Sequence, residues 1–134
     1  MSAVFDASVL VALLVDRGPV GRWAESRRDR EDVAVPHLAP VEASNVLRRQ
    51  VAHRQLSVEE ASRAHVDLAA MAIELYPFGP FAARIWELRE NVTSYDAWYV
   101  AVAEALDCPL LTLDDRLARA PGLRCEVITP STSA

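Results

Sequence analysis

Four acidic residues stand at the borders between expected strands and helices, where side chains are free to do chemistry. Asp6 follows the apolar stretch "AVF", and Asp114 follows "PLLTL". Glu42 and Asp96 each fall in the first turn of an expected helix. In open α/β sheets, ligands gather beyond the carboxyl ends of the strands, where helix N-termini also point. We therefore expect these four carboxylates to meet at one edge of the sheet.

A cluster of four carboxylates needs a positive partner. Moving an ion out of water without a partner costs several kcal/mol, and crowded like charges push each other toward protonation. The sequence contains no lysine, and Arg116 alone cannot neutralise four acids. Carboxylate oxygens are the ligands that hard divalent cations prefer. The acids therefore predict a site for Mg²⁺, or for Mn²⁺ in its place.

A purely structural role is the alternative for each acid taken singly. Asp6 could cap a helix that begins just after it, and Asp114 or Asp115 could cap the short helix expected next to them. Glu42 and Asp96 could be ordinary first-turn acids, which the helix dipole favours. Caps alone do not require acids to recur at four junctions of one small domain, and this recurrence favours a shared site.

The segments around these acids alternate between short apolar or β-branched runs and longer stretches of helical period. This alternation is typical of an α/β fold with a mostly parallel sheet of four or five strands. Strands are expected at residues 3–6, 32–36, 72–77, 108–115 and 125–129. Helices are expected at residues 8–15, 20–30, 40–55, 57–72, 80–90, 93–106 and 115–120. Ser57 and Glu60 have the spacing of a capping box, and Thr93 or Ser94 is expected to cap its helix.

Length and composition indicate one globular domain over residues 1–134. The chain is 51% hydrophobic and 25% charged, which is typical of a folded domain with a single core. The polar end at residues 129–134 is expected to fray. The formal net charge of −5 excludes an ordinary basic nucleic-acid binder, so any nucleic-acid role needs a bound cation.

Neither the cysteines nor the apolar segments indicate export or a membrane. Cys108 and Cys125 have no CxxC spacing, and we interpret them as small hydrophobic side chains in a reducing compartment. The apolar run at residues 9–15 is too short to cross a bilayer and lacks the basic start of a signal peptide. We therefore expect a cytoplasmic protein with no membrane segment.

Three longer stretches carry a family pattern. They are "VFDASVLVALL" at the N-terminus, "LAPVEASNVLRR" in the third helix and "TSYDAWYVAVAEALDCPLLTLDDRLA" near the end, the most specific of the three. With them, the sequence resembles the PIN-domain ribonucleases over essentially its whole length, and more closely the VapC-type toxins of bacterial toxin–antitoxin pairs. The resemblance implies a PIN-like three-layer α/β/α sandwich around a small, mostly parallel central sheet.

The resemblance also implies roles for single residues. The acidic metal-binding and catalytic positions of the family fall on Asp6, Glu42, Asp96 and Asp114. Two hydroxyl positions that are often found beside them match Ser8 and Thr112. Asp114 stands two residues after Thr112, as in the family's T-x-D pattern. Asp115 is therefore interpreted as a helix cap or an accessory residue.

The chemistry that the resemblance implies depends on the metal. The carboxylates would fix one or two Mg²⁺, which bind the scissile phosphate and lower the pKa of a water molecule. In-line attack of this water on phosphorus would leave 5′-phosphate and 3′-hydroxyl ends. The reaction needs neither a protein nucleophile nor a catalytic histidine, so we interpret His37, His53 and His65 as structural or surface residues.

RNA, an antitoxin and a second copy of the chain are the partners that the resemblance implies. Arginines at the rim could supply positive charge to an RNA substrate, and Arg116 is the nearest to the acids in sequence, with Arg119 one turn further on. Trp98 and Tyr99 could stack on an RNA base, although packing beneath the site is the stronger interpretation. A cognate VapB-type antitoxin and a homodimer are expected from the family alone.

Other classes of protein fit the sequence less well. A haloacid-dehalogenase-like phosphatase needs a second acid where Ser8 stands, and both it and a phospho-receiver domain need a lysine. The GxxxxGK pattern of a nucleotide-binding P-loop does not occur. The remaining alternative is a PIN-like module that binds RNA or protein without catalysis, which the presence of all four acids disfavours. Messenger, transfer and ribosomal RNA all remain candidate substrates.

Overall fold

A five-stranded parallel sheet forms the centre of the computed structural model, which describes residues 1–131. The strand order is β3-β2-β1-β4-β5, and every neighbouring pair is parallel. The strands are β1 (Ser2–Phe5), β2 (Asp32–Pro36), β3 (Ile73–Tyr76), β4 (Leu110–Leu111) and β5 (Val127–Ile128). The helices are α1 (Ala7–Val15), α2 (Pro19–Arg30), α3 (Ala39–Ala52), α4 (Val58–Ala70), α5 (Ala82–Glu87), α6 (Ser94–Leu106) and α7 (Asp115–Ala118), with a 3₁₀ turn η1 (Gly79–Phe81) before α5.

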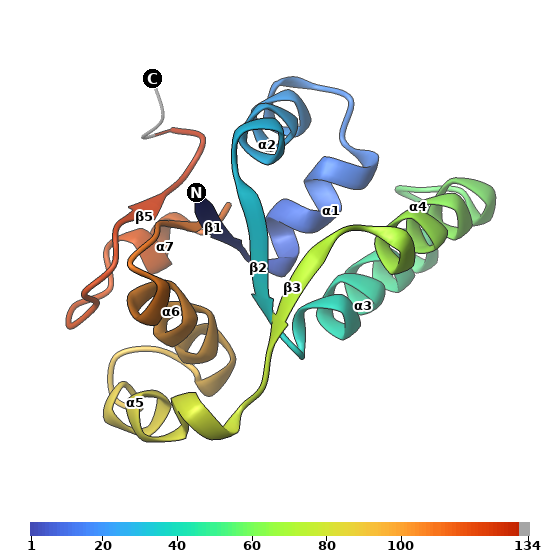
Figure 1. The fold of residues 1–134 in the computed structure, drawn as a ribbon. Helices are drawn as coiled ribbons and strands as arrows, with labels where there is room; N and C mark the ends of the chain where they lie inside the picture. Colours follow the sequence, from blue (N-terminus) through green and yellow to red (C-terminus); the bar gives the residue numbers. More distant parts are fainter. Residues whose placement is uncertain (132–134) are drawn as a thin grey trace.

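The strand order assigns the helices to two faces of the sheet. From β1 through β2 to β3 the chain moves in one direction, so right-handed crossovers place α1 to α4 on one face. Between β3 and β4 the chain returns past β1, so α5 and α6 lie on the opposite face. Figure 1 shows the blue-to-green helices on one side of the strands and the yellow-to-orange helices on the other. The predicted three-layer α/β/α architecture is confirmed, with a sheet that is entirely parallel.

The core lies on both faces of the sheet. Ala3, Val4 and Phe5 of β1 are fully buried, as expected for a parallel strand that is covered by helices on both sides. Helix α1 is apolar nearly all round, which is typical of a buried helix, and Val9 and Leu10 are fully buried within it. The sheet and the neighbouring helices α2 and α3 surround α1, which explains why it has no polar face.

The pairing of β1 with β4 sets up the site. Val4 lies opposite Leu110 and Phe5 opposite Leu111, so the residues that follow, Asp6 and Thr112, emerge side by side beyond the strand ends. The Asp6 N–H donates to the Leu111 carbonyl at 3.1 Å. The strand order reverses between these two strands, and a crevice at such a reversal is where α/β proteins bind ligands.

Several element boundaries differ from the predicted ones. The helix expected at residues 80–90 is a 3₁₀ turn followed by the short α5, because Gly79 and Pro80 favour a tight turn at its start. The strand expected at residues 108–115 is reduced to two residues, since Pro109 has no N–H to donate and the chain leaves the sheet at Thr112. The capping box of Ser57 and Glu60 is confirmed in full.

Residues 129–131, the first part of the expected tail, contact the rest of the domain. Thr129 is fully buried. The Ser131 hydroxyl donates to Oδ1 of Asp115 at 3.2 Å, which ties this segment to α7. The rest of the expected tail, residues 132–134, lies outside the described residues.

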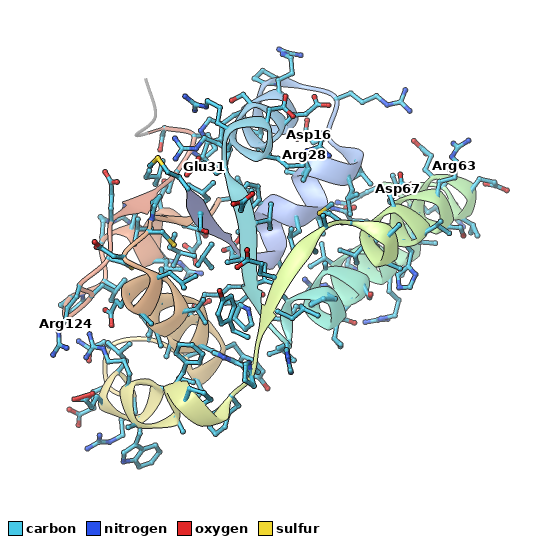
Figure 2. The ribbon with its side chains drawn as sticks, viewed as in Figure 1. Asp16, Arg28, Glu31, Arg63, Asp67 and Arg124 are labelled. Atoms are coloured by element: carbon cyan, nitrogen blue, oxygen red, sulfur yellow. The ribbon has the colours of Figure 1, made fainter. Side chains whose placement is uncertain are left out.

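Charged side chains surround the two helical layers. Figure 2 shows Arg63 and Asp67 projecting from α4, and Arg124 projecting from the segment before β5.

Cys108 and Cys125 are half-buried free thiols, and burial raises the pKa of the Cys125 thiol to about 11. Within residues 1–131, no helix is both long and apolar enough to cross a membrane.

Candidate active site

Asp6 occupies the most enclosed position of the site, at the junction of β1 and α1. The residue is 9% exposed. Oδ1 accepts hydrogen bonds from the Val9 N–H at 3.1 Å and the Ser8 hydroxyl at 2.5 Å, and Oδ2 accepts one from the Thr112 hydroxyl at 2.5 Å. Burial raises the pKa of Asp6, and these three donors oppose the rise in part. Asp6 is therefore both the N-cap of α1 and a candidate site acid.

Glu42 enters from the first turn of α3, which begins after β2. Its Oε1 accepts a hydrogen bond from the Tyr99 phenol at 2.8 Å. Burial raises the pKa of Glu42, the bond from Tyr99 opposes the rise, and the charges of Asp96 and Asp6 add to it. Glu42 is therefore close enough to Asp96 and Asp6 for their negative charges to raise its pKa.

Asp96 lies in the first turn of α6, on the opposite face of the sheet from α3. The Thr93 side chain caps this helix by accepting a hydrogen bond from the Asp96 N–H at 3.2 Å, so Thr93 rather than Ser94 is the N-cap. Burial and the nearby charge of Asp114 raise the pKa of Asp96, while Arg116 opposes the rise. The acid thus lies among like charges, as the sequence predicts.

Asp114 closes the site from the segment after β4. Its N–H donates to the Thr112 hydroxyl oxygen at 3.0 Å, and its Oδ1 accepts from the Arg116 N–H at 2.9 Å. This second bond makes Asp114 the N-cap of α7. The Arg116 side chain is 87% exposed and its Nε lies 3.5 Å from Asp114 Oδ1, so it forms only a solvent-screened ion pair.

One open pocket of about 360 Å³ brings these residues together. Its lining consists of Asp6, Ala7, Ser8, Glu42, Asp96, Tyr99, Leu113 and Asp114. The four predicted site acids and the predicted hydroxyl of Ser8 are all in this lining. The Thr112 hydroxyl lies directly behind it, fully buried against Asp6.

The chemistry of this lining fits a hard divalent cation. Four carboxylates share the pocket, and within residues 1–131 no salt bridge reaches Asp6, Glu42 or Asp96. In this same part of the chain, no three His, Cys, Asp or Glu side chains stand close enough together to hold a metal ion as they are. Binding would therefore require the carboxylates to turn toward a shared ion. These carboxylates are of the kind that bind a divalent cation, but in this arrangement no three of them lie close enough together to share one ion within residues 1–131.

Two accessory residues lie outside the pocket. Asp115 was predicted to be a helix cap or an accessory acid, but Asp114 is the cap and Asp115 instead accepts the hydrogen bond from Ser131. Arg116 is absent from the lining and points into solvent. Their neighbour Thr112 donates a hydrogen bond from its hydroxyl to Asp6 Oδ2.

The aromatic residues after Asp96 differ from each other. Tyr99 is 2% exposed, so stacking on an RNA base is excluded for it, and its hydroxyl holds Glu42. Trp98 is half-buried and packs edge-on against Phe78 at a centroid distance of 5.8 Å. Sequence analysis missed the contact between Tyr99 and Glu42. The signal was the three-residue spacing from Asp96 to Tyr99, which places both on one face of a helix.

Comparisons with known proteins agree with this geometry. The model of the PIN domain family matches residues 3–123. Ribonuclease VapC1 of Mycobacterium tuberculosis is 42% identical over 125 residues, which cover 92% of this chain and 94% of the relative. The crystal structure of PAE2754 from Pyrobaculum aerophilum superposes with a TM-score of 0.73 at 25% identity, covering 98% of this chain and 85% of that chain. VapBC-5 of Mycobacterium tuberculosis, a member of the VapBC family of toxin–antitoxin systems, superposes with a TM-score of 0.54 at 27% identity, covering 96% and 98%. The chain belongs to the PIN domain family, within the group of VapC-type ribonucleases.

Proposed function

We propose that the protein is an Mg²⁺- or Mn²⁺-dependent endoribonuclease and the toxin of a toxin–antitoxin pair. The observation that carries this proposal is the pocket at the reversal of strand order. Four carboxylates from four different segments line it, and three of them have a raised pKa. Gathering four carboxylates in one pocket is unfavourable in free energy without a cation and becomes favourable when a cation binds them.

The residues of the pocket would divide the work as follows. Asp6, Glu42, Asp96 and Asp114 would hold the metal, which would bind the scissile phosphate and lower the pKa of a water. Thr112 and Ser8 hold the Asp6 carboxylate in a fixed orientation, because their hydroxyls donate to its two oxygens. Arg116, exposed at the rim beside Asp114, can pair with an RNA phosphate.

The relatives support the substrate class and the partner. Ribonuclease VapC1 is named for cleavage of RNA, and VapBC-5 is described as part of a toxin–antitoxin system. By this likeness, the partners of the present protein are an RNA substrate and a cognate VapB-type antitoxin. We also propose that it pairs with a second copy of the chain. We also propose that it acts in the cytoplasm, where its RNA substrate would be found.

The test is cleavage of a cellular RNA pool by the purified protein with Mg²⁺, with Mn²⁺ and with EDTA. We expect discrete cuts with 5′-phosphate ends in the presence of metal. Asp96→Asn is expected to lower the cleavage rate by at least about 100-fold, because it removes a carboxylate ligand. Asp67→Asn is the matched control, since it removes the same charge from an exposed position on α4 and should cleave as the wild type does.

Two results would contradict the proposal. Cleavage by Asp96→Asn at the wild-type rate would remove Asp96 from the site. RNA binding without metal-dependent cleavage, by folded protein free of antitoxin, would instead favour the non-catalytic PIN-like binding module.

A further inference from the structure

We infer that Tyr99 is a positioning residue that fixes the Glu42 carboxylate in the active site. The inference rests on the proposed function, because it concerns how one of the proposed metal ligands is held. The Tyr99 hydroxyl donates to Oε1 of Glu42 at 2.8 Å, across 57 residues of sequence. The bond joins α6 on one face of the sheet to α3 on the other, directly at the pocket.

The burial of Tyr99 makes this hydrogen bond durable. The residue is 2% exposed, so water has little access to compete for the phenol. The phenol is the donor of this bond, and the Glu42 carboxylate is the acceptor. Tyr99 thus connects α6 and α3 at the pocket.

The position of Tyr99 on α6 links it to a second site acid. Asp96 and Tyr99 are three residues apart, so they lie on the same face of the helix. Both line the pocket. One face of α6 therefore supplies a carboxylate of its own and, through the phenol, orients a carboxylate from α3.

Glu42 depends on the hydrogen bond from Tyr99 more than Asp6 depends on any one of the hydrogen bonds that it accepts. Asp6 is held by three donors, from Ser8, Val9 and Thr112. Within residues 1–131, the phenol is the one hydrogen-bond donor to the longer and more flexible Glu42 side chain. Because the phenol engages Oε1, it leaves Oε2 for a metal ion. Outer residues that orient metal ligands in this way commonly change metal affinity by about 10–100-fold.

The test measures Mn²⁺ binding by calorimetry, without RNA, for four proteins: the wild type, Tyr99→Phe, Glu42→Gln and the double variant. Tyr99→Phe removes only the hydroxyl, and we expect it to weaken Mn²⁺ binding by about 10-fold. In the Glu42→Gln background the same change is expected to cost nothing further, because the ligand it positions is gone. Tyr95→Phe is the matched control, since it makes the same change at a 60% exposed position on the same helix.

The outcomes separate this inference from the proposed function. Wild-type protein that binds no Mn²⁺ would overturn both. Wild-type affinity in Tyr99→Phe, with weakened binding in Glu42→Gln, would overturn the inference alone. Additive losses in the double variant would also overturn it, because they would indicate a general structural role. Incorporation of 3-fluorotyrosine at position 99 keeps the hydroxyl, and it should bind Mn²⁺ as the wild type does even if Tyr99→Phe is too unstable to measure.

Discussion

The Asp6 carboxylate shows at the scale of one residue how a buried charge is maintained. It caps α1 through the Val9 N–H, and it also faces the pocket with the other site acids. The hydroxyls of Ser8 and Thr112 replace part of the hydration that Asp6 loses on burial. A capping role and a site role are therefore compatible, since an ionised carboxylate has about four lone-pair sites and can accept more than the bond that caps the helix.

Thr112→Val is expected to destabilise the protein at neutral pH. The substitution keeps the shape of the side chain but removes the donor to Asp6 Oδ2 and the acceptor for the Asp114 N–H. Leaving such buried groups unpaired costs about 1–3 kcal/mol. Urea unfolding at pH 7 measures the change, and Thr112→Ser, which keeps the hydroxyl, should lose clearly less. Equal stability of the two variants would show that the hydroxyl does not support Asp6.

Asp96→Asn should stabilise the metal-free protein while it removes activity. The pKa of Asp96 is raised by burial and by Asp114, so the native state holds its proton to a higher pH than the unfolded chain does. Ionised Asp96 therefore destabilises the fold, and the penalty grows as the pH rises from about 4 through the folded-state pKa. Each kcal/mol of relief would raise Tm by roughly 3–5 °C in a domain of this size. Melting curves at pH 5 and pH 8 should show the larger gain at pH 8, and a loss at pH 8 would refute the charge argument.

At the scale of elements, the long periodic segments were predictable and the short ones were not. Helices α1 to α4 and α6 lie close to their expected positions, because each combines a cap or breaker with a buried apolar face. Strands β4 and β5 are two residues long, and their ends depend on pairing with neighbours rather than on local composition. The helix expected at residues 80–90 breaks into η1 and α5 because Gly79 and Pro80 favour a tight turn at its start.

The site was predictable where the acids stand at element junctions and not where it depends on tertiary contacts. Asp6, Glu42, Asp96 and Asp114 mark strand ends and helix starts, so the parallel sheet brings them to one pocket. The bond from Tyr99 to Glu42 joins helices from opposite faces of the sheet. The spacing of Asp96 and Tyr99 places the phenol on the site face of α6, but no local pattern identifies Glu42 as its partner.

The contact between α1 and α2 depends on Gly21. A Cβ at this position would lie 1.8 Å from the Asp16 carbonyl oxygen, so the helices could not keep their present separation. Gly21→Ala is therefore expected to lower the free energy of unfolding by about 1–3 kcal/mol or more, as overpacking does. Gly79→Ala is the control, because a Cβ there meets nothing within 4 Å. Denaturant unfolding of both variants measures the difference, and equal stabilities would exclude a role for this close approach.

At the scale of the whole molecule, the fold concentrates negative charge at one edge of the sheet. The chain has a net charge of −5, and the fold gathers four of its acids at the one place where the strand order reverses. Glu60 and Glu104 are stabilised elsewhere by hydrogen bonds to their carboxylates, and their pKa values are lowered. The pKa values of Asp6, Glu42 and Asp96 are shifted in the opposite direction. The unfavourable electrostatic free energy of burying carboxylates close together is therefore concentrated at the pocket, where a bound cation would offset it.

A divalent cation should consequently stabilise the whole fold, and more strongly at neutral than at acidic pH. A ligand that binds only the native state adds about 2.7 kcal/mol at a free concentration of 100 times its Kd. Protons compete for Asp6, Glu42 and Asp96, whose raised pKa values extend this competition above pH 4, so the gain in Tm with MnCl₂ should be smaller at pH 5 than at pH 7.5. Thermal melts across a MnCl₂ series measure the gain, with Asp67→Asn expected to follow the wild type and Asp96→Asn expected to gain much less. If Asp96→Asn gained as much as the wild type, the cation would be binding elsewhere on the acidic surface, and the four carboxylates would lose their proposed role.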